Sequence, residues 1–225
     1  INMGYNESFT GFPREMIDFL WELRFNNNKE WFNANRDRYK LLLKEPMDAF
    51  AAQLGEEIYS RTGKIALPSV SRINRDVRFS KNKAPYRDNK WIVFKRETGA
   101  WTARPVIFFE LGPDYYMVGM GIYESLPVYM KAFRKKVDAN TPYFERLAKK
   151  YNGNENYKLD GDFYKKKLGD KSEDVMQWYQ RKAISLVYKR EIDSLLFERE
   201  LIDFCAGEFE YLTPFVDFFD SIMIE

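Results

Sequence analysis

The sequence contains no histidine among its 225 residues and only one cysteine, Cys205. The absence of histidine excludes Ser-His and Cys-His nucleophile pairs, the commonest general base, and zinc sites with histidine ligands. A single cysteine excludes an internal disulfide, so we expect a reducing, cytoplasmic setting in which Cys205 is a small core residue. Any chemistry must therefore use carboxylates, lysine, arginine, tyrosine or serine, and whether the chain is an enzyme is left open.

Long apolar runs and a strong net charge are also missing. The longest strongly apolar stretches, such as residues 106–109, are far shorter than the roughly 20 residues of a membrane-spanning helix, and residues 1–4 show no start of a signal peptide. Lysine and arginine number 36 against 34 aspartate and glutamate, which gives a net charge of +2. We therefore expect no membrane association, and any preference for anions must be local.

Aromatic residues are abundant instead, with 19 Phe, 15 Tyr and 5 Trp. They can supply a sizeable core, and we predict a single domain over residues 1–225. The order of patterns along the chain is helical, then β-rich, then helical again. It predicts an α+β fold in which N-terminal, middle and C-terminal helices pack around an antiparallel sheet.

The first half of the chain is expected to contain three helices and then four extended segments. The first helix opens at Pro13 and stops at Asn26-Asn27, the second starts near Asn28 and ends before Pro46, and the third covers residues 47–58. The extended segments are residues 69–79, 90–96, 105–111 and 115–122, and the last two form an antiparallel hairpin.

The second half is expected to be mostly helical. Helices begin at Ser125 to Pro127 and at Thr141-Pro142, and a polar loop spans residues 151–169. A short helix near residues 172–179 and a strand at 183–189 follow. A pair of C-terminal helices split at Thr213-Pro214 completes the chain.

The segment from residue 72 to residue 90 carries a concentrated positive charge. It holds seven lysines and arginines against two aspartates. If residues 72–80 form a strand, one face carries Arg72, Asn74, Asp76, Arg78 and Ser80, and the other carries Ile73, Val77 and Phe79. Arg75 interrupts the apolar face, where an arginine must be paired or reach a cavity. Arg75 is therefore either a member of a structural ion pair or part of a pocket wall.

Arginine side chains suit the bidentate binding of phosphate and carboxylate groups. We therefore predict that an anionic small molecule binds in a cleft built from this segment, with the candidate ligand residues Arg72, Arg75, Asp76, Arg78, Ser80, Lys83, Tyr86 and Arg134. Asp76 beside cations should have a lowered pKa, which suits an anchor or metal ligand better than a proton donor. No metal-ligand spacing is recognisable, and Gly119-x-Gly121 lacks the third glycine of a dinucleotide fingerprint, so neither a metal nor a cofactor is predicted.

Two other interpretations of the segment stay open. In the first, it is a nucleic-acid or protein-binding module in which Phe79, Tyr86 and Trp91 act as stacking surfaces. The near-neutral net charge makes nucleic acid the less favoured ligand. In the second, the charges only brace the fold. The sequence leaves the oligomeric state open.

Three stretches of the chain carry a family resemblance. They are Asn27-Asn28-Lys29-Glu30-Trp31-Phe32 with Asn35-Arg36-Asp37-Arg38-Tyr39, then Arg72-Ile73 through Arg78-Phe79-Ser80-Lys81-Asn82-Lys83-Ala84-Pro85-Tyr86, and Gly119-Met120-Gly121-Ile122-Tyr123 followed by Arg134. With these motifs the chain resembles the domain-of-unknown-function family 2461 of bacteria and fungi, although its members usually have Asp in place of Asn82 and Lys in place of Arg87. The resemblance implies a shared fold and a shared motif, and it implies no activity, cofactor or catalytic set.

Overall fold

The computed structural model describes residues 8–78, 81–96, 104–122 and 127–222, which form an α+β fold around one antiparallel sheet. The described strands are β1 (Leu67–Val70), β2 (Lys90–Lys95), β3 (Pro105–Leu111), β4 (Tyr115–Ile122), β5 (Tyr157–Asp160) and β6 (Ser185–Glu191). Their order in the sheet is β1-β2-β3-β4-β6-β5, and every neighbouring pair is antiparallel. The fold class and the hairpin of β3 and β4 are therefore confirmed.

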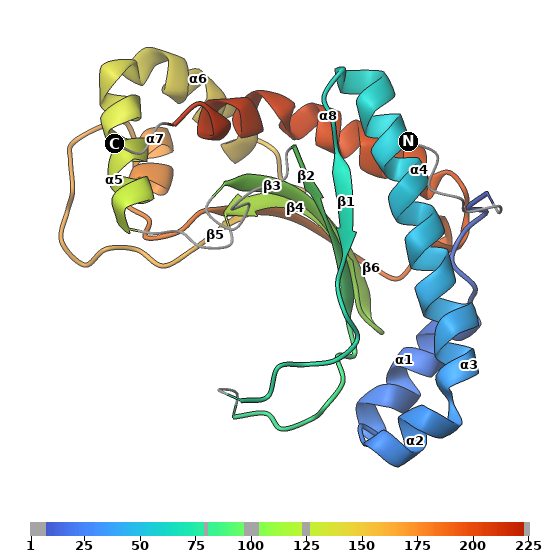
Figure 1. Cartoon of the computed structure of the whole chain (residues 1–225). Coiled ribbons are helices and arrows are strands. Elements are labelled where there is room, and N and C mark those ends of the chain that lie inside the picture. Colours follow the sequence, from blue (N-terminus) through green and yellow to red (C-terminus); the bar gives the residue numbers. More distant parts are fainter. Residues whose placement is uncertain (1–7, 79–80, 97–103, 123–126, 223–225) are drawn as a thin grey trace.

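The helices lie along one side of the sheet and at its two ends (Figure 1). They are α1 (Glu15–Phe25), α2 (Lys29–Ala34), α3 (Arg36–Tyr39), a π-helical segment (Lys40–Lys44), α4 (Glu45–Thr62), α5 (Pro127–Ala139), α6 (Thr141–Asn152), α7 (Glu173–Tyr179), a 3-10 helix (Ser194–Phe197) and α8 (Leu201–Asp220). Helix α8 packs across β3 and β4, and α4 packs on β1 and α8. Helices α1 to α3 gather near one end of the sheet, and α5 to α7 near the other.

Apolar stripes place these helices on the sheet, as the sequence predicts. Helix α1 buries Met16, Phe19, Leu20 and Leu23. Cys205 in α8 is fully buried, and burial raises the pKa of its thiol well above the ordinary value. The expectation that Cys205 is a small core residue is therefore confirmed.

The prediction that a helix ends before Pro46 is wrong. Helix α3, the π-helical segment and α4 follow one another without interruption from Arg36 to Thr62, and Pro46 lies in the first turn of α4. A proline inside a helix removes one N–H donor and crowds the preceding turn. The wider π-helical turn directly before Pro46 accommodates both effects.

The predicted break at Thr213-Pro214 is also wrong, because α8 runs through it as one helix. A proline in a helix interior costs roughly 3 kcal/mol. Leu212, Phe215 and Val216 around it are buried, and each such side chain contributes roughly 1.5–3 kcal/mol. Tertiary packing of α8 therefore outweighs the local preference of the proline.

The polar stretch 151–169 is not simply a loop. Helix α6 continues to Asn152, and β5 inside the stretch pairs with β6. The aromatic ring of Tyr157 lies 5.6 Å from that of Tyr188, and Leu159 is opposite Leu186. These contacts are made with residues about 30 positions later, so the local polar composition hides the strand.

The extended segment predicted over residues 69–79 leaves the sheet early, because β1 ends at Val70. Beyond it, residues 71–78 and 81–89 form a two-stranded extension that we call the basic arm and that projects past the end of β1 and β2 (Figure 1). The N–H of Arg75 donates to the carbonyl of Pro85, and the N–H of Arg87 donates to that of Ile73, both at 2.8 Å. The segment therefore pairs with its own continuation, with Asn74 opposite Tyr86.

Candidate functional site: the basic arm

The base of the basic arm is held by the first of the sequence motifs. Asn27 donates from Nδ2 to the carbonyl of Tyr86 and accepts from the N–H of Tyr86, each at 3.0 Å. The ring of Phe32 stacks on that of Tyr86 with centroids 4.0 Å apart. Asn28 caps α2 by accepting from the N–H of Trp31 at 2.9 Å. Two motifs 59 residues apart therefore meet, and these contacts fix the arm to the helices.

A chain of ion pairs links Arg75 through Asp88 to Arg24 of α1. Arg24 Nε donates to Asp88 at 2.5 Å, and the guanidinium of Arg75 lies 3.9 Å from the other oxygen of Asp88. The Arg75 side chain is 23% exposed, and its Nε is buried with no hydrogen-bond partner among the described residues. Glu110 accepts from Asn89 at 2.9 Å and from Tyr115.

The described parts of the arm's tip are ordered by local hydrogen bonds. Asp76 accepts from the backbone N–H of Arg78 at 3.1 Å and forms an ion pair with its guanidinium at 2.6 Å. These hydrogen bonds from Arg78 lower the pKa of Asp76 to about 2, in the direction expected from the sequence. Lys83 Nζ donates to the carbonyl of Val77 at 2.9 Å. Asp76 is therefore ionised at neutral pH and orients Arg78.

An open cleft of about 460 Å³ lies along the arm, and its walls carry four guanidinium groups and one carboxylate. The lining residues are Arg72, Asn74, Arg75, Asp76, Arg78, Arg87 and Trp91. The guanidinium of Arg87 lies over the ring of Trp91, 4.5 Å from its centroid. Within the described residues, Arg72 and Arg87 form no ion pair with a carboxylate. The cleft is thus locally cationic in a chain that is close to neutral.

The predicted face of the segment is recognisable in this cleft. Arg72, Asn74, Asp76 and Arg78 are exposed, Ile73 is buried and Arg75 is half-buried. The alternation of exposed and less exposed side chains expected for a strand is therefore present, although residues 72–78 belong to no strand of the sheet. Arg75 combines the two alternatives drawn from the sequence, since it faces Asp88 and also lines the cleft.

Of the eight candidate ligand residues, Arg72, Arg75, Asp76 and Arg78 line the cleft. Tyr86 is 8% exposed beneath Phe32, Lys83 points its ammonium at the arm's own backbone, and Ser80 lies outside the described residues. Asn74, Arg87 and Trp91 line the cleft instead. The pairing of Asn74 with Tyr86 places Arg87 and Trp91 in the same cleft as Arg72. This pairing cannot be read from residue spacing alone, so Arg87 and Trp91 were not among the predicted ligand residues.

Arg134 belongs to a different part of the molecule. It lies on α5, lines a separate open groove of about 780 Å³ and has its guanidinium 5.3 Å from the ring centroid of Tyr164. The basic arm meets the sheet at Lys90, whose partner Leu111 is opposite Tyr116, whereas α5 follows the other end of β4. Eight residues of strand span roughly 25 Å, so Arg134 does not join the arginines of the cleft.

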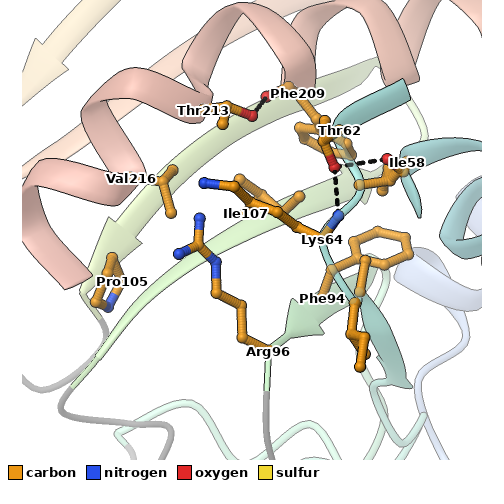
Figure 2. Close-up of a pocket in the computed structure, with 12 residues that line it drawn as sticks. Ile58, Thr62, Lys64, Phe94, Arg96, Pro105, Ile107, Phe209, Thr213 and Val216 are labelled. Atoms are coloured by element: carbon orange, nitrogen blue, oxygen red, sulfur yellow. Dashed lines mark hydrogen bonds between the residues drawn. The ribbon is translucent and has the colours of Figure 1, made fainter. Parts of the chain in front are cut away.

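A second candidate is a small cavity between α4, α8 and the sheet (Figure 2). Its volume is about 30 Å³, and most of its walls are apolar side chains, including Ile58, Phe94, Ile107, Phe209 and Val216. One water needs roughly 10–15 Å³ measured in this way. The cavity therefore admits one or two waters and no larger ligand.

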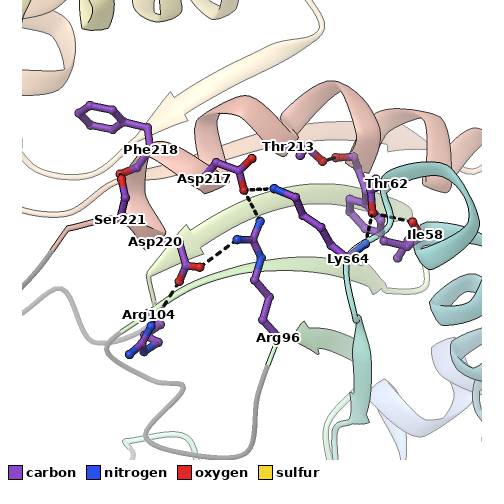
Figure 3. Close-up of polar contacts among 11 residues, drawn as sticks. Ile58, Thr62, Lys64, Arg96, Arg104, Thr213, Asp217, Phe218, Asp220 and Ser221 are labelled. Atoms are coloured by element: carbon purple, nitrogen blue, oxygen red, sulfur yellow. Dashed lines mark hydrogen bonds and ion pairs between the residues drawn. The ribbon is translucent and has the colours of Figure 1, made fainter.

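Charged side chains extend from this cavity along the last turn of α8 (Figure 3). Asp217 pairs with Lys64 and, at 2.7 Å, with Arg96, while Asp220 pairs with Arg96 at 2.9 Å and with Arg104 at 3.5 Å. Burial raises the pKa of Asp217, but hydrogen bonds from Lys64 and Arg96 outweigh it and hold the pKa below its ordinary value. Each carboxylate has two cationic partners among the described residues, so the cluster, which we call the α8 clamp, ties the last turn of α8 to Lys64, Arg96 and Arg104.

Among the residues that the structure describes, no group of three or more cysteine, aspartate and glutamate side chains could hold a metal ion. In the same part of the chain, no helix has the length and apolar character needed to cross a membrane.

Comparison with known proteins gives one result. A family model described as Conserved hypothetical protein (DUF2461) matches residues 15–218, a range that includes the basic arm and the whole sheet. No curated protein matches the chain.

Proposed function

The chain belongs to the conserved hypothetical protein family DUF2461, and we propose that it binds an anionic small molecule, through a phosphate or carboxylate group, in the cleft of the basic arm. One observation carries the proposal. Four arginines line a single open cleft with one carboxylate, and two of the four, Arg72 and Arg87, have no ion-pair partner among the described residues. An anionic group between them would gain two charge-assisted contacts.

The other two arginines have supporting roles in this proposal. Arg78 is oriented by Asp76, and Arg75 is held near Asp88. The size of the cleft, about 460 Å³, falls within the roughly 300–1,000 Å³ of small-molecule sites. Two fixed guanidinium groups beside two that have no carboxylate partner favour a compact anion over an extended chain.

The burial of Tyr86 supports a small molecule over nucleic acid. Single strands bind through successive bases stacked on exposed aromatic rings. Phe32 covers Tyr86, so of the three aromatic residues considered for stacking, only Trp91 lines the cleft within the described residues. A cytoplasmic location is part of the proposal, and the free thiol of Cys205 supports it.

A thermal-shift titration at low ionic strength tests the proposal. We expect inorganic phosphate or citrate to raise the Tm of the wild-type protein, since a ligand stabilises the folded state that binds it. The variant that combines Arg72→Ala with Arg87→Ala should lose this shift. The control is Arg199→Ala, which removes an arginine that is 64% exposed and weakly paired with Asp203. A shift that is equal in all three proteins, or absent from the wild type across phosphates and carboxylates, would contradict the proposal.

A further inference from the structure

The cleft of the basic arm opens onto the face of the sheet opposite α8. Successive side chains of each strand point to opposite faces of the sheet. Phe94 and Phe109 point to the helices, because the ring centroid of Phe94 lies 5.7 Å from that of Phe209 in α8. The ring centroid of Phe109 lies 4.8 Å from that of Phe50 in α4. The residues next to them in sequence therefore point the other way. Trp91 belongs to this second set and also lines the cleft.

This outer face carries a row of apolar side chains beside Trp91. Across β2, β3 and β4, one row of this face consists of Trp91, Glu110 and Met117. The next row consists of Val93, Phe108 and Gly119. Trp91, Phe108 and Met117 are only half-buried. A Cβ on Gly119 would overlap the carbonyl oxygen of Leu186 and lie 3.1 Å from the Phe108 ring, so the glycine allows the close approach of β6 and also leaves room for that ring. We call Trp91, Phe108 and Met117 the apolar shelf.

Arg87 and Trp91 join the apolar shelf to the cationic cleft. The guanidinium lies 4.5 Å from the indole centroid, and such a stack presents a flat, cationic surface. An aromatic ring can stack on this surface while an anionic group attached to it reaches Arg72. Stacking of a flat ring on an aromatic side chain tolerates many ring types because each has a π-face.

Glu110 limits the charge of the ligand. Its carboxylate, held by Asn89 and Tyr115, lies on the strand position directly opposite Trp91. Directly opposite residues in antiparallel strands are roughly 5 Å apart. A second anionic group on the ring would therefore meet like charge, so the arrangement favours a ligand with one anionic group.

We infer that the ligand is an aromatic anion, a small molecule in which a flat ring joined to one phosphate or carboxylate group stacks at Trp91 and Arg87. This inference rests on the proposed anion site and adds the ring to it. A nucleoside monophosphate and an arylacetate are two sources of the same chemistry.

Isothermal titration of matched pairs tests the inference. Adenosine 5′-monophosphate is compared with ribose 5-phosphate, and phenylacetate with acetate. In the wild type, we expect the ring-bearing member of at least one pair to bind about tenfold more tightly than its ring-free partner, and the pair that shows the ratio identifies phosphate or carboxylate as the anionic group. The ratio should fall to about one in Trp91→Leu and survive in Trp91→Phe. The matched control is Trp21→Leu, because Trp21 also carries a guanidinium over its ring, that of Arg24 at 4.6 Å.

The outcomes separate this inference from the proposed function. If ring-free and ring-bearing anions bind equally in both pairs, or if the ratio survives in Trp91→Leu, the inference is overturned and the anion site stands. If none of the four anions binds, both fail. An RNA octamer that binds more than tenfold more tightly than adenosine 5′-monophosphate would assign the face to nucleic acid and overturn the inference.

Discussion

Lys90, at the junction between the basic arm and the sheet, should make the stability of the protein rise with pH. The residue is 2% exposed, its ammonium donates to the carbonyl of Ser71, and the ammonium nitrogen lies 6.0 Å from the ring centroid of Tyr39. Burial lowers the pKa of Lys90 to about 8 from 10.5, with a smaller opposing effect of Asp48 and a smaller added effect of Lys44. The folded state therefore releases the proton more readily than the unfolded chain does.

The sign and the size of the effect follow from this difference. Between pH 8 and pH 10.5 the unfolded chain binds more protons than the folded one, so the free energy of unfolding rises with pH. Below pH 8 Lys90 is charged in both states and its contribution is flat. With pKa values of about 8 and 10.5, the gain between pH 7 and pH 9.5 is about 2 kcal/mol.

The assay is urea denaturation of the wild type and of Lys90→Met at pH 7.0, 8.0, 9.0 and 9.5. The range stops below pH 10 because tyrosines such as Tyr116, whose pKa is raised by burial, add the opposite trend once tyrosines ionise in the unfolded chain. We expect the wild-type free energy of unfolding to gain about 2 kcal/mol relative to the variant across this range. Parallel pH profiles for the two proteins, or an NMR titration that places the Lys90 amine near its ordinary pKa, would refute the reasoning.

Two further predictions concern backbone strain and the α8 clamp. Gly11 has a φ of +123°, and a Cβ there would overlap the Phe197 carbonyl, so Gly11→Ala should lower the free energy of unfolding in urea by at least about 3 kcal/mol. Gly63 has a φ of +66° and no atom within 4 Å of an added Cβ, so Gly63→Ala should cost only about 1 kcal/mol. Equal costs for the two variants would contradict this reasoning. Asp217 has a pKa held below 3.8 in the folded state, so its ion pairs stabilise the protein above pH 3.8 and are lost as the pH falls through the lower folded value. Asp217→Asn should therefore cost about 1 kcal/mol at pH 7, a value reduced for its partial exposure, and the difference from wild type should shrink in acid unfolding; a constant difference would be the contrary result.

Local periodicity predicted the parts of the fold that depend on one element at a time. The apolar stripe of α1, the β3–β4 hairpin and the alternation from Arg72 to Arg78 all follow from side-chain spacing. The two prolines, Pro46 and Pro214, were misjudged because the packing of the whole helix decides whether a proline ends it.

The site was predicted less well because its membership depends on contacts between distant segments. The burial of Tyr86 requires Phe32 from α2, and the exclusion of Arg134 depends on the end of the sheet from which α5 starts. Arg87 and Trp91 join the cleft through the pairing of Asn74 with Tyr86. None of these pairings has a signal in the spacing of a single sequence.

The most direct test of the anion site is an NMR titration of the indole N–H groups with inorganic phosphate. The chain has five tryptophans, of which Trp91 lines the cleft and Trp178 is fully buried elsewhere. We expect the Trp91 signal to shift to saturation while the Trp178 signal stays in place. A Trp91 signal that does not move, or one that moves without saturation together with all the others, would contradict it.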